Sequence, residues 1–209
     1  KEGYAERCFF ANFTLPQKTE RTPRALSRED FEKIRDVEIP AWRTTHILVR
    51  DLFLFACYTG TAYADAVSVT RDNLYSDDVG CLWLKYRRQK NELRASVKLL
   101  PEALALIEKY HDDNRPTLFP MVYHPNLRRH MKSLAVLAGV SSTLCYHQAR
   151  HSFASLITLE AGVPIETISR MLGHSDIQTT QVYARVTPKK LFEDMDKYIE
   201  ATKDLKLVL

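Results

Sequence analysis

The sequence predicts an α+β protein, a mainly helical single domain that carries one small antiparallel β-sheet. Apolar residues recur at helical spacing through most of the chain after Ser27. The spacing changes between residues 73 and 100, where three short apolar runs are separated by turn residues. The chain has 209 residues, of which 45% are hydrophobic and 27% charged, as in folded proteins that bury one sizeable core.

The first 26 residues differ in character from the rest. Pro16 and Pro23 interrupt this segment, and basic residues are interspersed in it. Such a composition is typical of an extended arm or an interdomain linker. We therefore expect residues 1–26 to connect the folded domain, residues 27–209, to a further domain upstream.

Caps and helix breakers give the element boundaries. Ser27 has the side chain of an N-cap residue, with Asp30 at the third helical position, so a helix is expected to begin at residue 28. A strongly apolar helix over residues 45–58 is expected to end at Gly60. Later helices are expected over residues 101–112, 125–138, 146–161, 165–172, 179–185 and 188–202, and strands over residues 74–75, 81–86 and 95–99.

The last of these helices is amphipathic. Its apolar face carries Leu191, Phe192, Met195, Tyr198 and Ile199. This face can pack on its own domain or on a neighbouring copy of the chain, and the sequence is compatible with both.

Cysteine usage and hydropathy narrow the class of protein. Cys8, Cys57, Cys81 and Cys145 are scattered without a C-x-x-C pair, which argues for reduced thiols in a cytoplasm rather than a disulfide framework or a zinc site. No apolar run approaches the roughly 18 residues that a membrane span requires, so no membrane partner is expected.

Three short motifs stand in order between residues 147 and 183. His147 and Arg150 are three residues apart, so on a helix they share one face and can both touch a single phosphate. Leu172-Gly-His174 follows in a second apolar segment, and Tyr183 comes nine residues after His174. Each motif alone is better explained as an ordinary structural or surface residue. Their order and spacing together favour a phosphate-binding site followed by a nucleophile.

Basic residues cluster in two places, although the net charge is only +4. The first cluster is Lys85, Arg87, Arg88, Lys90, Arg94 and Lys98, and the second is Arg128, Arg129 and Lys132. Clusters of this kind are often solvated faces. Beside a phosphate site they favour a nucleic-acid backbone as partner. We assign backbone binding to Arg87, Arg128, Arg129 and Lys132.

The motif pattern resembles the catalytic core of the tyrosine recombinases, the phage-integrase family of DNA strand-exchange enzymes, over nearly the whole chain from Ser27 onward. The resemblance implies the catalytic-domain fold of that family. It also implies cleavage and rejoining of DNA through a 3′-phosphotyrosine intermediate, with no metal and no nucleotide cofactor. Tyr183 would be the nucleophile, and Arg150, His147 and His174 would bind the phosphate, because a phosphodiester opened without a metal needs cations and donors at its oxygens.

The family uses a hairpin lysine to protonate the leaving 5′-oxygen. Lys90 fits this role, since it lies in the turn between the second and third expected strands. An exposed hairpin lysine without a catalytic role is the alternative. If the strand extends that far, Arg88 shares a face with Lys90, because side chains alternate with period two.

The chain departs from the family in its first arginine box, which normally reads TG-x-R with a carboxylate three residues later. Here Ala62 stands in place of the arginine, and Asp65 fits the carboxylate. Losing such a donor costs on the order of 3 kcal/mol, roughly a hundredfold in rate. Arg88 is the first candidate for a substitute cation and Arg50 the second.

Ala62 is also compatible with a substitution introduced to trap a DNA complex, and with a relative that only binds DNA. The TG-x-[AS]-[YF]-x-D form of the box resembles integrases of conjugative transposons. This resemblance favours a natural substitution.

Three rival interpretations stay open. Residues 163–177 have the pattern of a helix-turn-helix DNA-binding module without catalysis. A metal-independent nuclease, or a type IB topoisomerase that relaxes DNA, would use similar groups. His147 and His151 have the spacing of a zinc-binding helix, but Gln148 stands where a metalloprotease needs glutamate.

The resemblance also implies partners. Double-stranded DNA is the substrate, and strand exchange between two duplexes implies a homotetramer on DNA, with a monomer when free. Accessory DNA-bending proteins are expected, and the implied location is the bacterial cytoplasm, at the nucleoid when the protein is on DNA.

Overall fold

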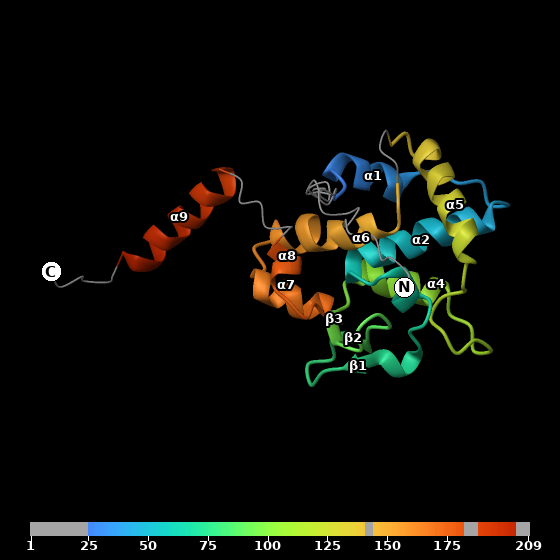
Figure 1. Ribbon diagram of the computed structural model, residues 1–209, viewed down its shortest axis with the longest axis horizontal. Coiled ribbons are helices and arrows are strands. Elements are labelled where there is room, and N and C mark those ends of the chain that lie inside the picture. Colours follow the sequence, from blue (N-terminus) through green and yellow to red (C-terminus); the bar gives the residue numbers. More distant parts are fainter. Residues whose placement is uncertain (1–24, 141–143, 182–187, 204–209) are drawn as a thin grey trace, which may run out of the picture.

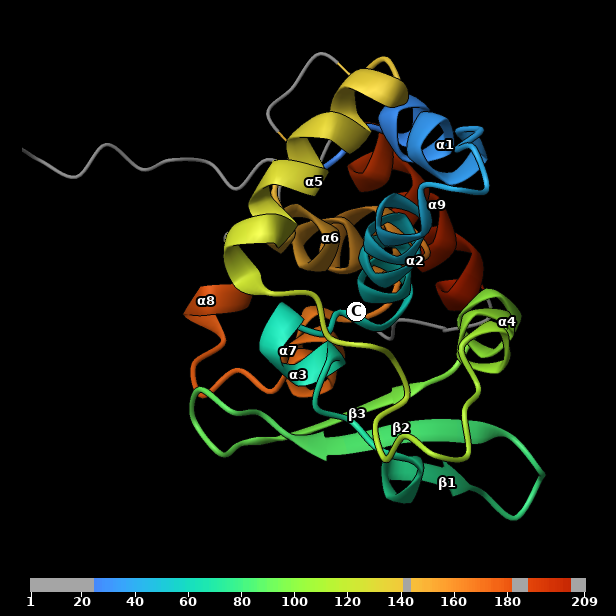
Figure 2. The ribbon, with the colours of Figure 1, turned by 90° about the vertical axis from the view of Figure 1, so that its right-hand side faces the viewer.

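The computed structural model describes residues 25–140, 144–181 and 188–203 (Figure 1). The expected fold class is confirmed: the chain is mainly helical and contains a three-stranded antiparallel sheet in the order β1-β2-β3. The strands are β1 (Leu74–Ser76), β2 (Leu82–Arg87) and β3 (Arg94–Lys98). The sheet lies along one side of the domain, with the longer helices on the other side (Figure 2).

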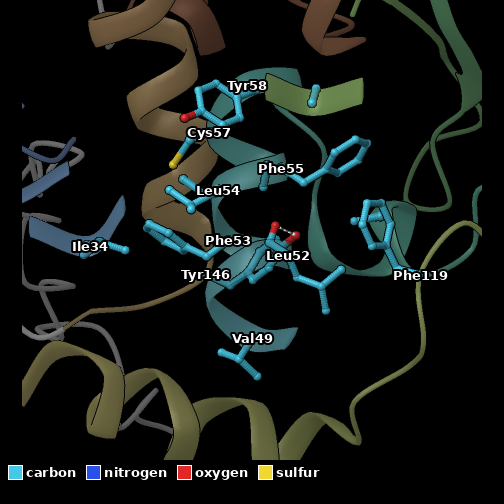
Figure 3. Packing of buried hydrophobic residues seen from close by; sticks show 14 of the residues in the cluster. Ile34, Val49, Leu52, Phe53, Leu54, Phe55, Cys57, Tyr58, Phe119 and Tyr146 are labelled. Carbon is cyan, nitrogen blue, oxygen red and sulfur yellow. Dashed lines mark hydrogen bonds between the residues drawn. The ribbon is translucent and has the colours of Figure 1, made fainter. Parts of the chain in front are cut away.

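The domain is built around helix α2 (Thr44–Thr59), which is buried along most of its length. Helix α1 (Arg28–Asp36) packs on it, with the ring of Phe31 set edge-on to that of Tyr58. Figure 3 shows apolar side chains of α2 packed with Ile34, Phe119 and Tyr146 from other elements, and the hydrogen bond that the Tyr146 hydroxyl donates to the Leu52 carbonyl. As expected, the Ser27 hydroxyl caps α1 by accepting a hydrogen bond from the Asp30 N–H at 3.1 Å.

Helices α4 (Pro101–Lys109) and α5 (His124–Leu137) flank α2. The prediction that the first of them continues to residue 112 was wrong, because α4 ends at Lys109. Lys109 and Tyr110 both bind the buried carboxylate of Asp51 on α2, and the Arg115 guanidinium donates to the Tyr110 carbonyl. These contacts turn the chain away from the helix axis. The short helices α3 (Tyr63–Ala66) and η1 (Arg71–Asn73) were not expected.

The single helix expected over residues 146–161 is two elements, α6 (His147–Ser152) and the π-helix η2 (Phe153–Leu159). The Thr158 hydroxyl donates to the carbonyls of Phe153 and Ala154, and the Ser155 hydroxyl donates to that of His151. Side-chain hydroxyls that bind helix carbonyls widen or bend the turn. This hydroxyl-rich composition accounts for the change of helix type.

The C-terminal part holds α7 (Ile165–Leu172), α8 (Gln178–Gln181) and α9 (Pro188–Thr202). The expected helix over residues 179–185 is seen only as far as Gln181, because residues 182–187 lie outside the described ranges. Figure 1 shows α9 standing apart from the rest of the domain. Its apolar residues Phe192, Met195, Tyr198 and Ile199 are exposed, from 47% to 67%. None of the helices in the described ranges has both the length and the apolar character that crossing a bilayer requires.

Candidate active site

Arg150 lies at the centre of the candidate site and is buried, with 1% of its surface exposed. Its Nη1 donates to the Gly60 carbonyl at 2.6 Å, and its Nη2 donates to the Leu172 carbonyl at 2.5 Å. These carbonyls lie at the C-terminal ends of α2 and α7, where a helix dipole favours a cation. Arg150 therefore joins three elements that are distant in sequence.

Glycines make this junction possible. Gly60 and Gly173 end α2 and α7 with φ values of +70° and +61°, in the left-handed region that favours glycine. A Cβ on Gly60 would approach Phe153 to 2.6 Å, and a Cβ on Gly173 would approach the Arg88 side chain to 2.8 Å. The glycine of the first arginine box and the glycine of the Leu-Gly-His motif are thus required for the same two reasons: each ends a helix with a positive φ, and each leaves no room for a side chain.

The two histidines of the motifs lie beside Arg150. The pKa of His147 is lowered by desolvation and then by the charges of Arg150, Arg88 and Lys90. The pKa of His174 is lowered to about 4, again by desolvation first and then by Arg150 and Arg88. Both rings are therefore neutral at pH 7, and each offers one N–H donor and one lone pair.

The end of strand β2 places Arg88 and Lys90 in different environments. Strand β2 stops at Arg87, so the condition under which Arg88 and Lys90 would share a face is not met. Arg88 is buried, whereas Lys90 is exposed in the turn that follows. The alternation that buries Leu84 and Tyr86 extends to Arg88 and then ends, because the chain turns back toward β3.

Arg88 connects the β2–β3 hairpin to Gly173, at the end of α7, and to Asp65 of α3. Its Nη1 donates to the Gly173 carbonyl at 3.2 Å, and its Nε lies 3.6 Å from Asp65 Oδ2. The other oxygen of Asp65 accepts a hydrogen bond from the Gln89 N–H at 2.9 Å. Asp65, the carboxylate of the first arginine box, thus faces Arg88, while Ala62 forms the N-cap position of α3.

Arg50 lies elsewhere on the molecule. Its Nε donates to Asp51 at 2.8 Å and its Nη1 to the Val37 carbonyl at 3.1 Å. Arg50 precedes Gly60 by ten residues, which is about 15 Å along a helix axis. The structure brings Arg88 to the site and does not bring Arg50 there.

Tyr86 belongs to the site and was not singled out from the sequence. It is buried on β2, and its pKa is raised to about 12, by desolvation first, with the charges of Arg150, Asp65 and Arg88 acting on it as well. The signal that could have found it is the alternation along β2, in which Leu84, Tyr86 and Arg88 share the inward face.

The residues assigned to DNA-backbone binding are exposed. Arg128 and Lys132 of α5 line a cavity of about 430 Å³ together with His147 and Tyr63. Arg129 lies on the same helix. Arg87 points to the outer face of β2, where its Nη1 donates to the Glu92 carbonyl at 3.3 Å.

Two expectations concern the nucleophile and metal binding. Tyr183 lies outside the described residues, so its place in the site stays a prediction.

His147 and His151 stack edge to face, with their ring centres 4.4 Å apart. Among the described residues, no group of three or more His, Cys, Asp or Glu side chains is arranged to hold a metal ion.

Comparison with proteins of known sequence identifies relatives. Tyrosine recombinase XerD of Chlorobaculum tepidum is 26% identical over 193 residues, which cover 84% of this chain and 61% of the relative. XerD of Pseudomonas putida is 29% identical over 195 residues, which cover 85% of this chain and 62% of the relative. The chain thus spans about three fifths of the length of the curated relatives it matches.

Solved structures share the fold. The XerH site-specific recombinase in its post-cleavage complex with palindromic difH has a TM-score of 0.67 at 18% identity, covering 94% of this chain and 60% of that one. The Tn1549 transposon integrase with a circular intermediate DNA has a TM-score of 0.63 at 15% identity, covering 88% and 68%. The catalytic domain of bacteriophage HP1 integrase has a TM-score of 0.58 at 18% identity, covering 85% and 96%.

A model of the phage integrase family matches residues 25–190. This range contains the arginine, histidine and glycine positions described above, and it makes up well over half of the sequence. The chain therefore belongs to the phage integrase family, the tyrosine recombinases.

Proposed function

We propose that this chain is the catalytic domain of a site-specific DNA recombinase, which cleaves and rejoins strands through a 3′-phosphotyrosine at Tyr183 and uses no metal or nucleotide cofactor. The observation that carries the proposal is the convergence of Arg150, His147, His174 and Arg88 from separate segments. Arg150 is tied to two helix ends, and its charge and that of Arg88 act on both histidines. A simple DNA-binding module has no need of such a cluster.

The proposed reaction begins with attack of the Tyr183 phenol oxygen on phosphorus. A phenol with a pKa near 10 is a weak nucleophile at neutral pH, so its proton must pass to a base as the bond forms. Neutral His147 has the lone pair to accept it. Arg150 and the Nε2–H of His174 donate to the non-bridging oxygens, where charge accumulates in the transition state.

The bond from phosphorus to the 5′-oxygen then breaks. Lys90 gives a proton to that oxygen, which leaves as a hydroxyl, and the 3′-phosphate remains covalently joined to Tyr183. In the second half of the reaction, the 5′-hydroxyl of a partner strand attacks phosphorus and restores the phenol. One phosphodiester is exchanged for another, so no nucleotide is consumed.

Arg88 supplies the cation that Ala62 cannot supply. Its guanidinium pairs with Asp65, the carboxylate that the family places beside the first arginine. Among the described residues, Arg88 donates through Nη1 to the Gly173 carbonyl and faces Asp65 through Nε, so the two hydrogens of Nη2 remain for a phosphate oxygen. Arg50 has no part in this arrangement, because it is bound to Asp51 and Val37.

Assembly and substrate follow from the same proposal. Double-stranded DNA binds through Arg87, Arg128, Arg129 and Lys132, and residues 1–26 link the catalytic domain, residues 27–209, to an upstream domain. The exposed apolar face of α9 supports packing on a neighbouring copy, in a DNA-bound homotetramer that is a monomer when free. Accessory DNA-bending proteins and a nucleoid location when the protein is on DNA belong to this proposal.

The helix-turn-helix alternative is not favoured by the geometry. Helix α8 spans four residues, Gln178–Gln181, in the described part of the chain. Ile168 and Leu172 of α7 are buried, and the Leu172 carbonyl binds Arg150. Helix α7 and the turn after it therefore build the phosphate site.

The test is covalent trapping on a nicked DNA duplex, from which the cleaved 5′ fragment diffuses away. The protein is incubated with this substrate in EDTA and analysed on denaturing gels. We expect an adduct with the wild type and none with Tyr183→Phe, whereas Tyr198→Phe, which changes an exposed tyrosine of α9, leaves the adduct unchanged. An adduct formed by Tyr183→Phe refutes the nucleophile assignment.

The topoisomerase alternative is separated by a second assay. A recombinase exchanges strands between two copies of its own site, whereas a type IB topoisomerase relaxes supercoiled plasmid without site preference. Rapid relaxation of a plasmid that lacks the site would favour the topoisomerase.

A further inference from the structure

Thr180 is a buried residue of α8 whose hydroxyl bonds directly to the candidate site. Its side-chain oxygen lies 2.8 Å from Nδ1 of His174, and only 1% of the residue is exposed. The preceding residue, Thr179, is exposed. Two adjacent threonines thus differ in environment: one faces solvent and the other faces a histidine of the phosphate site.

The direction of this hydrogen bond depends on the tautomer of His174. Among the described residues, His174 is the hydrogen-bond partner of the Thr180 hydroxyl, and a buried hydroxyl hydrogen needs an acceptor. The ring of His174 is neutral, since its pKa is lowered to about 4 by desolvation and by neighbouring cations. A neutral imidazole that accepts at Nδ1 carries its hydrogen on Nε2.

Backbone contacts tie the same segment to the rest of the site. The His174 N–H donates to the Ser169 carbonyl at 3.0 Å, and the Thr180 N–H donates to the Ile177 carbonyl at 2.7 Å. The carbonyls of Leu172 and Gly173, just before His174, accept from Arg150 and Arg88. Thr180 thus connects α8 to a loop that both arginines hold in place.

We propose that Thr180 is a positioning residue, which fixes His174 as an Nε2–H donor for the phosphate and ties α8, three residues before Tyr183 in the sequence, to the phosphate site. The inference rests on the proposed function, since it assigns His174 a donor role in strand cleavage. Thr180 itself does not touch the DNA. It acts through the orientation and the tautomer of the imidazole.

The experiment compares three variants of the full chain. Thr180→Val keeps the shape and removes the hydroxyl, Thr180→Ser keeps the hydroxyl, and Thr179→Val is the exposed control. Single-turnover adduct formation is measured at saturating nicked DNA, and DNA affinity is measured separately in a Tyr183→Phe background. We expect Thr180→Val to lower the cleavage rate at least tenfold with affinity within about twofold. Thr180→Ser should stay within about threefold of the wild type, and Thr179→Val should match it.

A second measurement reports the tautomer of His174 without relying on the cleavage rate. Nitrogen-15 NMR of histidine-labelled protein at pH 7, with His174 assigned by its loss in His174→Gln, reports the tautomer directly. We expect the Nε2–H form in the wild type and a mixture of tautomers in Thr180→Val. A merely structural contact would leave the tautomer unchanged.

Three outcomes overturn the inference: an Nδ1–H tautomer in the wild type, a wild-type cleavage rate for Thr180→Val, or a loss in Thr180→Ser as large as in Thr180→Val. Failure of the proposed function is a different result, because the wild type would then form no adduct on nicked DNA whatever the tautomer. The two failures are therefore distinguishable.

Discussion

The two buried arginines of the site are held by different kinds of partner. Arg150 donates to two backbone carbonyls at the ends of α2 and α7. Arg88 faces the carboxylate of Asp65 and donates to a single carbonyl, that of Gly173. One guanidinium is thus fixed by helix ends, whereas the other takes part in an ion pair on the hairpin side.

The difference matters for how much charge each arginine offers to a phosphate. A carbonyl at a helix end carries a partial charge, whereas a carboxylate carries a full one. Asp65 therefore neutralises more of the charge on Arg88 than the helix ends neutralise on Arg150. We infer that Arg150 contributes more to stabilisation of the transition state and also more to the architecture of the site.

The largest effect is expected from Arg150→Ala. Removing this side chain takes away donors to the phosphate and leaves the Gly60 and Leu172 carbonyls without their partner, at a cost of about 1–3 kcal/mol for each buried group. Adduct formation on nicked DNA should fall at least a thousandfold, with a lower Tm. Arg128→Ala, on the exposed face of α5, is the control and should retain the Tm. Arg150→Ala with a wild-type Tm would contradict the architectural half of the comparison.

Lys90→Ala is expected to follow in size, because general acids contribute roughly a hundredfold to ten-thousandfold. The cause can be isolated with a substrate whose leaving 5′-oxygen is replaced by sulfur, a leaving group that needs no proton. Lys90→Ala should be slow on the oxygen substrate and close to the wild type on the sulfur substrate. An equal defect on both substrates would place Lys90 in DNA binding instead.

Arg88→Ala should lower the rate of adduct formation roughly a hundredfold, equivalent to about 3 kcal/mol, if Arg88 replaces the arginine missing at Ala62. Arg50→Ala is the matched control and should cleave at the wild-type rate. If Arg50→Ala were slow and Arg88→Ala cleaved at the wild-type rate, Arg50 and not Arg88 would be the substitute for the missing arginine.

The ion pair can be separated from the catalytic role by a double variant. Arg88→Ala alone leaves the Asp65 carboxylate buried without its cation, which destabilises the fold. In Arg88→Ala with Asp65→Asn, we expect the Tm to recover toward that of the wild type while cleavage stays slow. Recovery of cleavage in this double variant would show that Arg88 acts only by neutralising Asp65.

Much of the fold could be predicted because its signals are local. Residues close together in the sequence determine the Ser27 cap, the end of α2 at Gly60 and the three strands. The structure has these features where the sequence predicts them. The end of α4 depends instead on Asp51, which lies more than fifty residues earlier in the chain. The π-helix rests on hydroxyls that bind carbonyls four or five residues earlier in the same segment, and helical spacing of the apolar residues does not distinguish it from an α-helix.

The site shows the same division. His147, Arg150 and His174 could be named from their spacing, and the structure places them together. The pairing of Arg88 with Asp65 could not be read from spacing, because it requires the hairpin and α3 to meet in space. Tyr86 and Thr180 were missed for a related reason, since a buried tyrosine and a buried threonine look like ordinary core residues until their neighbours are known.

The smallest effect expected is a dependence of stability on pH near Arg150. The pKa values of His151 and His174 are both lowered to about 4, by desolvation first, with the charge of Arg150 lowering each further. Since these folded-state values lie below the ordinary histidine value of 6.5, the unfolded chain binds more protons as the pH falls, and the Tm should decrease from pH 7 to pH 5. His151→Phe should make this decrease smaller, whereas the exposed His111→Gln should not. A Tm that is constant over this range would contradict the lowered pKa values of these two histidines.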